Sequence, residues 1–182
     1  MSSSSTTSSS KKNNLFFLVG LMGTGKTHWA KALAQKNKYK FIDLDELIES
    51  KNNNSILKLF NEFGEDAFRK KEHETLVELF SIQEKTIIAT GGGTACFFDN
   101  MNLMNQNGIT IWLNDSIENI CERLESYKSS RPLIANESSS HLKNTITNMY
   151  HSRLNFYNMA KYSLARIEIS IEHLQNIINI YA

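Results

Sequence analysis

The chain has 182 residues, with 20 Lys and Arg side chains against 19 Asp and Glu, which gives a formal net charge of +1. This balance produces no long-range field that favours nucleic acid, and no apolar run reaches the roughly 18–20 residues that a membrane-spanning helix needs. The only two cysteines, Cys96 and Cys121, lack CxxC spacing. We interpret them as reduced, mostly buried thiols of a cytoplasmic protein.

Residues 1–14 differ in composition from the rest of the chain. They are rich in Ser and Thr and contain no apolar side chain after Met1, so we expect a disordered tail that adds nothing to a core. Residues 15–182 are enough for one domain with a single core. Within that domain, the polar segment at about 127–140 is predicted to be a mobile lid.

Apolar runs alternate with helical patterns from residue 15 onward. In chain order we expect a strand at 15–19, a helix at 26–36, a strand at 39–43, helices at 45–50, 55–61 and 66–82, a strand at 86–89, a helix at 97–106, a strand at 109–113, helices at 116–126 and 141–160, a strand at 164–169 and a helix at 171–181. Strands that alternate with helices form parallel βαβ units. The pattern therefore predicts an α/β fold, a three-layer αβα sandwich around a parallel sheet of about five strands.

A glycine-rich segment, GLMGTGKT at residues 20–27, follows the first predicted strand and precedes a helix. It satisfies G-x4-G-K-[ST], the phosphate-binding P-loop, in the structural context that this motif requires. Its backbone N–H groups form an anion site at a helix N-terminus. Lys26 is expected to reach the β- and γ-phosphates of a nucleotide, and the Thr27 hydroxyl to bind Mg²⁺. The short chain lacks an NKxD-like guanine-recognition segment, which favours a small-molecule kinase.

Two carboxylates, Asp43 and Asp45, stand at the end of the second predicted strand. If residues 43–45 stay extended, both side chains point to the same side. A phosphoryl-transfer site needs one carboxylate for the waters of the metal and another to orient or deprotonate the attacking hydroxyl. The alternative is that Asp45 is only the N-cap of the helix that follows.

Further polar residues suggest a second, anionic substrate. Arg69 and Glu72 share a helix face, where they form either a surface ion pair or a guanidinium that Glu72 orients toward a substrate carboxylate. Gly91–Gly93 stand at the end of the third strand and favour close approach of the backbone to a ligand. Arg131 lies in the predicted lid, and Arg153 lies on the last long helix. Taken singly, each arginine is more often a solvated charge than a ligand.

Together and in this order, these features closely resemble the motifs of the shikimate kinase family, from about residue 15 to the C-terminus. The motifs are GLMGTGKT, FIDLD, FRKKE, ATGGGT, RPLI and RLNFYNMA, the last of which contains Arg153 and Tyr157. The resemblance implies transfer of the γ-phosphoryl group of ATP to the 3-hydroxyl of shikimate, in aromatic amino-acid biosynthesis. It further implies a monomer that uses Mg²⁺ and that acts on neither nucleic acid nor a membrane.

The resemblance also implies roles for individual residues. On the nucleotide side, the phosphates would be bound by Gly23, Thr24, Gly25, Lys26, Thr27, the backbone of His28, and Arg131 of the lid. Lys26 and Arg131 would also act in catalysis, Thr27 would bind Mg²⁺, and Asp43 would hold a water on the metal. On the acceptor side, Asp45 would bind the shikimate hydroxyls and act as the base. Arg69, Arg153 and the N–H of Gly92 would bind the carboxylate.

Some positions depart from the family pattern. His28 and Ala30 follow the P-loop where the family commonly has a small hydroxylic residue and Gly. The lid is one residue longer, which makes Arg123 a candidate for stacking on adenine, and we interpret Trp29 and Trp112 as core residues. Two alternatives remain: another small P-loop kinase, such as a gluconate kinase, and a kinase-like binding protein without catalysis.

Overall fold

The computed structural model of the protein describes residues 14–126 and 139–181. The elements in chain order are β1 (Leu15–Val19), α1 (Lys26–Asn37), β2 (Lys40–Asp43), α2 (Leu44–Asn52), α3 (Ile56–Leu79), β3 (Thr86–Ala89), the 3-10 turn η1 (Thr94–Cys96), α4 (Asn100–Asn107), β4 (Ile109–Asn114), α5 (Ile117–Ser126), α6 (Ser139–Tyr157), β5 (Tyr162–Ala165), the 3-10 turn η3 (Arg166–Glu168) and α7 (Ile171–Asn179). Strands and helices therefore alternate as the sequence predicts.

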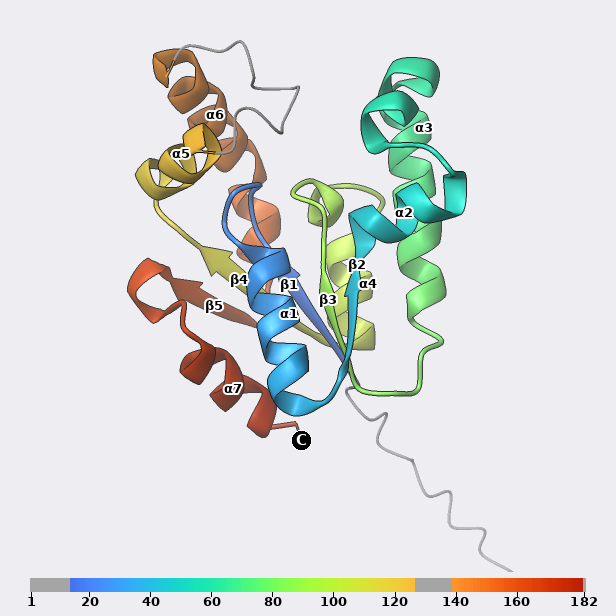
Figure 1. Ribbon diagram of the computed structural model, residues 1–182, viewed down its shortest axis with the longest axis vertical. Helices are drawn as coiled ribbons and strands as arrows, with labels where there is room; N and C mark the ends of the chain where they lie inside the picture. The colour runs from blue at the N-terminus through green and yellow to red at the C-terminus, as the bar shows by residue number, and fades with distance from the viewer. Residues whose placement is uncertain (1–13, 127–138, 182) are drawn as a thin grey trace, which may run out of the picture.

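The five strands form one parallel sheet in the order β2-β3-β1-β4-β5 (Figure 1). β1 lies at the centre, and all five of its residues are buried. This central place explains its continuous apolar run, because a strand covered on both faces has no polar side. The predicted parallel sheet of five strands is confirmed.

Helices cover both faces of the sheet. On one face, Phe16 and Leu18 of β1 pack with Leu33 of α1 and Leu174 of α7. On the other face, Phe17 and Val19 belong to a larger cluster with residues of α2, α3, α4, α5 and α6. Alternate residues of β1 thus face opposite cores, as the period of a strand requires. The three-layer αβα sandwich is confirmed.

The helices α2 and α3 form a lobe beside the edge strand β2 (Figure 1). Asp43 caps the start of α2, and Ser55 caps the start of α3 by accepting the N–H of Lys58. α3 combines the two helices predicted at 55–61 and 66–82, with a kink at Gly64, where φ is 80° and ψ is 171°. The kink turns the first part of α3 relative to the part that carries the FRKKE motif.

Several predicted boundaries are wrong, among them those of β5, α4 and α6. The strand expected at 164–169 is β5 at Tyr162–Ala165, followed by the turn η3. The helix expected at 97–106 begins at Asn100, because Phe98 and Asp99 have φ angles of 48° and 59° that a helix does not allow. α6 begins at Ser139 and ends at Tyr157, so it takes the last two residues of the predicted lid, and residues 127–138 lie outside the described part of the chain.

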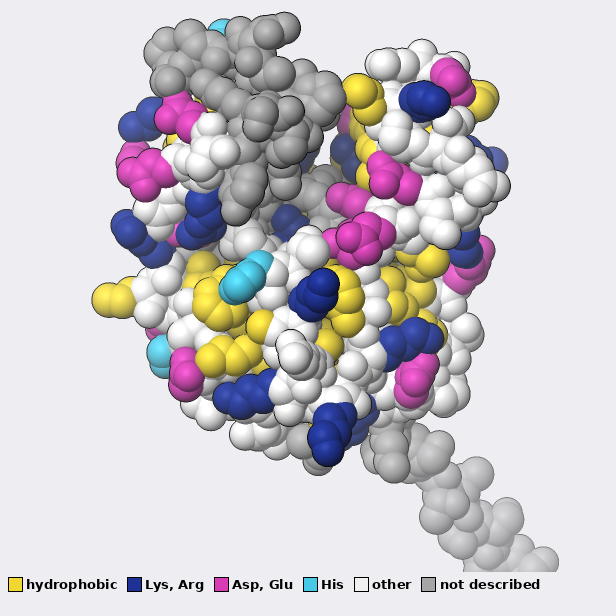
Figure 2. Space-filling view, viewed as in Figure 1, with side chains coloured by type: hydrophobic (Ala, Val, Ile, Leu, Met, Phe, Trp, Pro, Cys, Tyr) yellow, Lys and Arg dark blue, Asp and Glu magenta, His cyan; other side chains and the backbone are white. Residues whose placement is uncertain are grey.

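The surface carries both signs of charge. On the face seen in Figure 2, Lys and Arg side chains are interspersed with Asp and Glu, in keeping with the near-zero net charge. Within residues 14–126 and 139–181, no helix is both long and apolar enough to cross a bilayer. Both cysteines are unpaired; Cys121 is buried and Cys96 is half-buried.

Candidate active site

The predicted strand ends meet at one edge of the sheet. β2, β3 and β1 are neighbours and parallel, so their carboxyl ends lie side by side. The P-loop follows β1, Asp43 ends β2, and Gly91–Gly93 follow β3. Open parallel sheets bind ligands at this edge. The expected convergence of the three segments is confirmed.

The P-loop wraps around the side chain of Lys26. Gly25 is the N-cap of α1 and has a φ of 85°, a left-handed conformation that glycine adopts without strain. The Lys26 ammonium group is buried and donates to the carbonyls of Gly20 and Leu21, both at 2.8 Å. The loop therefore has the form of an anion nest at the N-terminus of a helix.

Asp43 joins the P-loop to the helix α2. Its Oδ2 accepts the Thr27 hydroxyl at 2.7 Å, and its Oδ1 accepts the N–H groups of Asp45 at 3.0 Å and Glu46 at 3.3 Å. The N-cap of α2 is thus Asp43, and the alternative that Asp45 has this role is wrong. The expectation of an extended segment at 43–45 is also wrong, because the helix starts at Leu44.

Asp45 lies in the first turn of α2 and lines the large cavity of the site. Its surroundings raise the pKa of its carboxyl group from 3.8 to about 6, chiefly through burial and then through the charges of Asp43 and Glu72. Lys26 and Arg69 act in the opposite direction but do not outweigh these effects. A carboxylate with a pKa near 6 is ionised at neutral pH and can accept a proton.

The glycines Gly91–Gly93 allow charged side chains to approach the backbone. A Cβ atom on Gly91 would lie 2.7 Å from Oδ1 of Asp45, and one on Gly93 would lie 2.6 Å from Nη2 of Arg69. None of the three glycines has a positive φ. They are therefore needed for space rather than for backbone conformation.

Arg69 is buried, so the interpretation of a surface ion pair is wrong. The side chain is 9 % exposed, and its Nη1 donates to Glu72, 1 % exposed, at 2.8 Å. Glu72 in turn accepts the Thr94 hydroxyl at 2.5 Å, and Glu65 accepts Nε and Nη2 of Arg69 at 3.2 and 3.1 Å. Two carboxylates therefore fix the guanidinium, as the alternative that Glu72 orients Arg69 predicts.

Arg153 and Tyr157 of α6 meet the same turn from the other side. Nη1 of Arg153 donates to the carbonyl of Gly92 at 3.1 Å, and the Tyr157 hydroxyl donates to that carbonyl at 2.5 Å. Burial raises the pKa of the Tyr157 hydroxyl, and its ring stacks on Trp112 at 5.7 Å. Arg69 and Arg153 therefore contact neighbouring glycines of one turn.

A cavity of about 620 Å³ joins the P-loop to the acceptor residues. Its lining includes Gly23, Gly25, Lys26, Thr27, His28, Asp43, Asp45 and Gly92, and also Met22, Trp29, Thr90, Arg123 and Leu124. Arg69 and Arg153 do not line this cavity: Arg69 lies behind Gly93, and Arg153 donates to the carbonyl of Gly92. Arg131 lies outside the described residues. Most residues expected from the motifs are thus brought together.

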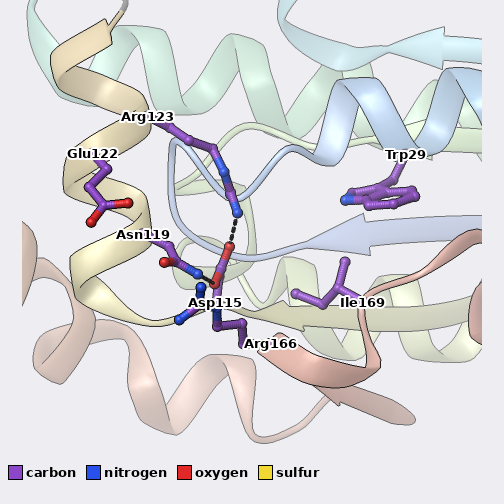
Figure 3. Close-up of a pocket in the computed structure, with 7 residues that line it drawn as sticks. All are labelled: Trp29, Asp115, Asn119, Glu122, Arg123, Arg166 and Ile169. Carbon is purple, nitrogen blue, oxygen red and sulfur yellow. Dashed lines mark hydrogen bonds and ion pairs between the residues drawn. The ribbon is translucent and has the colours of Figure 1, made fainter.

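A second cavity of about 260 Å³ adjoins the first and shares Trp29 and Arg123 with it (Figure 3). Arg123 donates to the carbonyl of Gly23 at 2.8 Å and pairs with Asp115, which also accepts the side chain of Asn119 at 2.8 Å. Arg166 lies at its edge. The cavity therefore extends from the P-loop toward the ends of β4 and β5.

Sequence reasoning missed part of this second cavity. Trp112 is buried as predicted, and Trp29 packs against the core as predicted but is half-buried and also lines both cavities. Asp115 directly follows β4, and the rule that ligands meet strand ends could have identified it. Thr94 is the last residue of the motif ATGGGT, but its contact with Glu72 of α3, 22 residues earlier, cannot be inferred from the sequence.

The chain is similar to known proteins in sequence and in fold. A sequence model of the shikimate kinase family matches residues 22–180. A shikimate kinase of Azobacteroides pseudotrichonymphae is 43% identical over 144 residues, covering 79% of this chain and 85% of the relative. The crystal structure of shikimate kinase from Bacteroides thetaiotaomicron has a TM-score of 0.85 and 36% identity, and covers 91% of this chain and 98% of its own.

A third similar protein is the shikimate kinase of Acinetobacter baumannii in complex with shikimate. It has a TM-score of 0.80 and 30% identity, and the match covers 93% of both chains. Both solved structures share the parallel sheet and the flanking helices. The family model and these relatives cover most of the chain, and the chain belongs to the shikimate kinase family of ATP-dependent phosphotransferases.

Proposed function

We propose that the chain transfers the γ-phosphoryl group of ATP to the 3-hydroxyl group of shikimate. The observation that carries the proposal is the meeting of Asp45, Arg69 and Arg153 at the triple-glycine turn beside the P-loop. Shikimate is a cyclic triol with one carboxylate. It therefore needs an acidic partner for its hydroxyls and guanidinium groups for its anion.

On the acceptor side, Asp45 accepts the proton of the attacking hydroxyl, for which its raised pKa is suited. Arg69 and Arg153 bind the carboxylate, together with the N–H of Gly92. The two glutamates on Arg69 support this role, because they hold the guanidinium in one orientation before the acceptor binds. Arg153 is restrained in a similar way by the Gly92 carbonyl.

On the nucleotide side, the backbone N–H groups of the P-loop, from Gly23 to His28, bind the phosphates. Lys26 lies inside the loop and is the cation that meets the β- and γ-phosphates as charge develops on them. Arg131 remains the expected lid arginine and would add a second positive charge. The smaller cavity takes the adenine base, between the planar groups of Trp29 and Arg123.

The residues around Thr27 fit a magnesium ion. The Thr27 hydroxyl donates its hydrogen bond to Asp43, so the lone pairs of the Thr27 oxygen can face a cation. Among the described residues, no three or more His, Cys, Asp or Glu side chains are grouped to hold a metal. This suits Mg²⁺, which is commonly held by one or two protein oxygens with waters and phosphate oxygens. When bound, the ion would neutralise charge on the β- and γ-phosphates.

We also expect a monomer, as the resemblance implies, which light scattering will test. The expected cytoplasmic location is part of the same proposal and is tested by cell fractionation. Neither property affects the assignment of the acceptor.

The decisive experiment measures ADP release from Mg-ATP by a coupled assay, with shikimate, with gluconate and with no acceptor. We expect turnover with shikimate alone. Turnover with gluconate instead would assign the chain to the alternative small-molecule kinase. Saturable ATP binding without turnover on either acceptor would favour the kinase-like binding protein. Omission of Mg²⁺ should abolish the reaction, and its restoration should recover it.

A further inference from the structure

Three aromatic rings surround the guanidinium of Arg69, and one of them comes from a distant part of the chain. The guanidinium carbon lies 4.4 Å from the ring centroid of Phe97, 5.1 Å from that of Phe68 and 5.7 Å from that of Phe60. Phe60 and Phe68 belong to α3, as does Arg69, whereas Phe97 follows the turn η1. All three distances lie within the ~6 Å over which the face of a ring attracts a cation.

The hydrogen bonds of Arg69 show what the rings add. Glu65 and Glu72 accept from Nε, Nη2 and Nη1, and these bonds restrain the guanidinium within its own plane. They restrain it less against tilting out of that plane. Packing against its faces supplies the missing restraint: a Cβ on Gly93 would lie 2.6 to 2.9 Å from Nη2, the central carbon and Nη1 alike, so the backbone of Gly93 packs directly against the group.

Phe97 lies close to the triple-glycine turn, where its ring can restrain Arg69. It comes four residues after Gly93, at the other end of η1, its ring is the nearest of the three, and it is half-buried. The ring excludes water from the guanidinium. Because water weakens the attraction between opposite charges, its exclusion strengthens the attraction of the guanidinium for an anion. An aliphatic side chain of similar size would fill the space but would lack the negative face of the ring.

We propose that Phe97 is a positioning residue for the acceptor: its ring fixes and desolvates the Arg69 guanidinium that binds the acceptor carboxylate. This inference rests on the proposed function, in which Arg69 has that role. It extends the acceptor site beyond the motifs to the turn between η1 and α4.

The test compares steady-state kinetics of Phe97→Leu, Phe97→Tyr and the wild type. For Phe97→Leu we expect the KM for shikimate to rise roughly three- to thirtyfold, while kcat and the KM for ATP stay within about twofold. Phe97→Tyr keeps the ring and is expected to restore the wild-type KM. The matched control is Phe98→Leu, because Phe98 is exposed and its ring lies against His73 at 5.2 Å.

A double-mutant cycle tests whether the effect passes through Arg69. In an Arg69→Gln background, Phe97→Leu should change kcat/KM for shikimate by less than about twofold. An equal loss in both backgrounds, or an aliphatic variant with wild-type KM, would overturn the inference while leaving the proposed function intact. A wild type that neither binds nor phosphorylates shikimate would overturn both. Thermal unfolding checks each fold, and Phe97→Met replaces Phe97→Leu if the latter unfolds.

Discussion

Replacement of Asp45 by Asn is expected to stabilise the folded protein at neutral pH while it removes phosphoryl transfer. Burial and the neighbouring charges of Asp43 and Glu72 raise the pKa of the Asp45 carboxyl from 3.8 to about 6. The ionised form that catalysis needs is therefore the form that the fold disfavours. Asparagine has nearly the same shape and cannot ionise. The stability of Asp45→Asn relative to the wild type therefore measures the free energy that ionisation of Asp45 costs the folded protein.

The sign and size of the effect follow from linkage. Below pH 3.8 the carboxyl is protonated in both the folded and the unfolded chain, and its ionisation costs nothing. As the pH rises toward 6 the unfolded chain ionises first, so the free energy of unfolding falls. Above pH 6 the carboxyl is ionised in both states, and the full shift of its pKa lowers the free energy of unfolding by about 3 kcal/mol. The advantage of Asp45→Asn should thus grow from about 1.5 kcal/mol at pH 5 to about 3 kcal/mol at pH 8.

Urea unfolding at pH 5 and pH 8 without nucleotide measures this difference. Asp66→Asn is the matched control, because it removes the same charge from an exposed position on α3. Turnover of Asp45→Asn should fall by at least about 10²-fold with ATP binding retained, and wild-type kcat/KM for shikimate should rise with pH through about 6. A stability gain equal at both pH values, or joint loss of ATP binding and transfer, would refute the reasoning.

Three further variants test other parts of the site. Arg153→Ala should lower kcat/KM for shikimate by about 2–5 kcal/mol with an unchanged KM for ATP, whereas Lys143→Ala, at a surface ion pair of the same helix, should have no effect on either. Trp29→Leu should raise the KM for ATP about three- to tenfold, as for a lost stacking contact. It should also abolish the quenching of tryptophan fluorescence by ADP, since Trp112 is buried. Gly64→Ala should destabilise the fold by about 1–3 kcal/mol in a thermal melt, because φ of 80° and ψ of 171° strain any residue with a Cβ. The added methyl would meet no atom within 4 Å, so this effect comes from the backbone and not from a clash.

The fold was largely predictable because its signals are local. The apolar run of β1 and the P-loop spacing define the central strand and the nucleotide side without any knowledge of distant contacts. The error at β5 has a physical cause: this edge strand pairs only with β4, and the pairing ends at Asn114 with Ala165. Beyond that pair there is no strand to continue the ladder. The chain therefore turns, and Ile167, which the apolar pattern assigns to the strand, is 91% exposed.

The acceptor side was less predictable because its residues depend on packing between distant segments. FRKKE has the composition of a solvated helix face, and the burial of Arg69 depends in part on contacts with Gly93 and Phe97, which come more than twenty residues later. Likewise, the two aspartates were identified, but their roles follow from where β2 stops. Its last pair with β3 is Asp43 with Ala89, so the next residue is free to begin a helix that Asp43 caps.

The triple glycine follows from the same packing. A single glycine would admit one close neighbour, whereas this turn has carboxylates against Gly91, Arg153 near Gly92 and the guanidinium of Arg69 against Gly93. A side chain at Gly91 would come within 2.8 Å of the carboxylates of Asp45 and Glu72, and one at Gly93 within 2.6 Å of the Arg69 guanidinium, so these groups would have to shift. A small misplacement of such groups costs catalysis heavily. Because opposite charges are held at successive positions of one turn, the site can bind an acceptor whose hydroxyls and carboxylate lie on opposite parts of a small ring. The spacing of the charges, more than any single residue, therefore accounts for the acceptor that we propose.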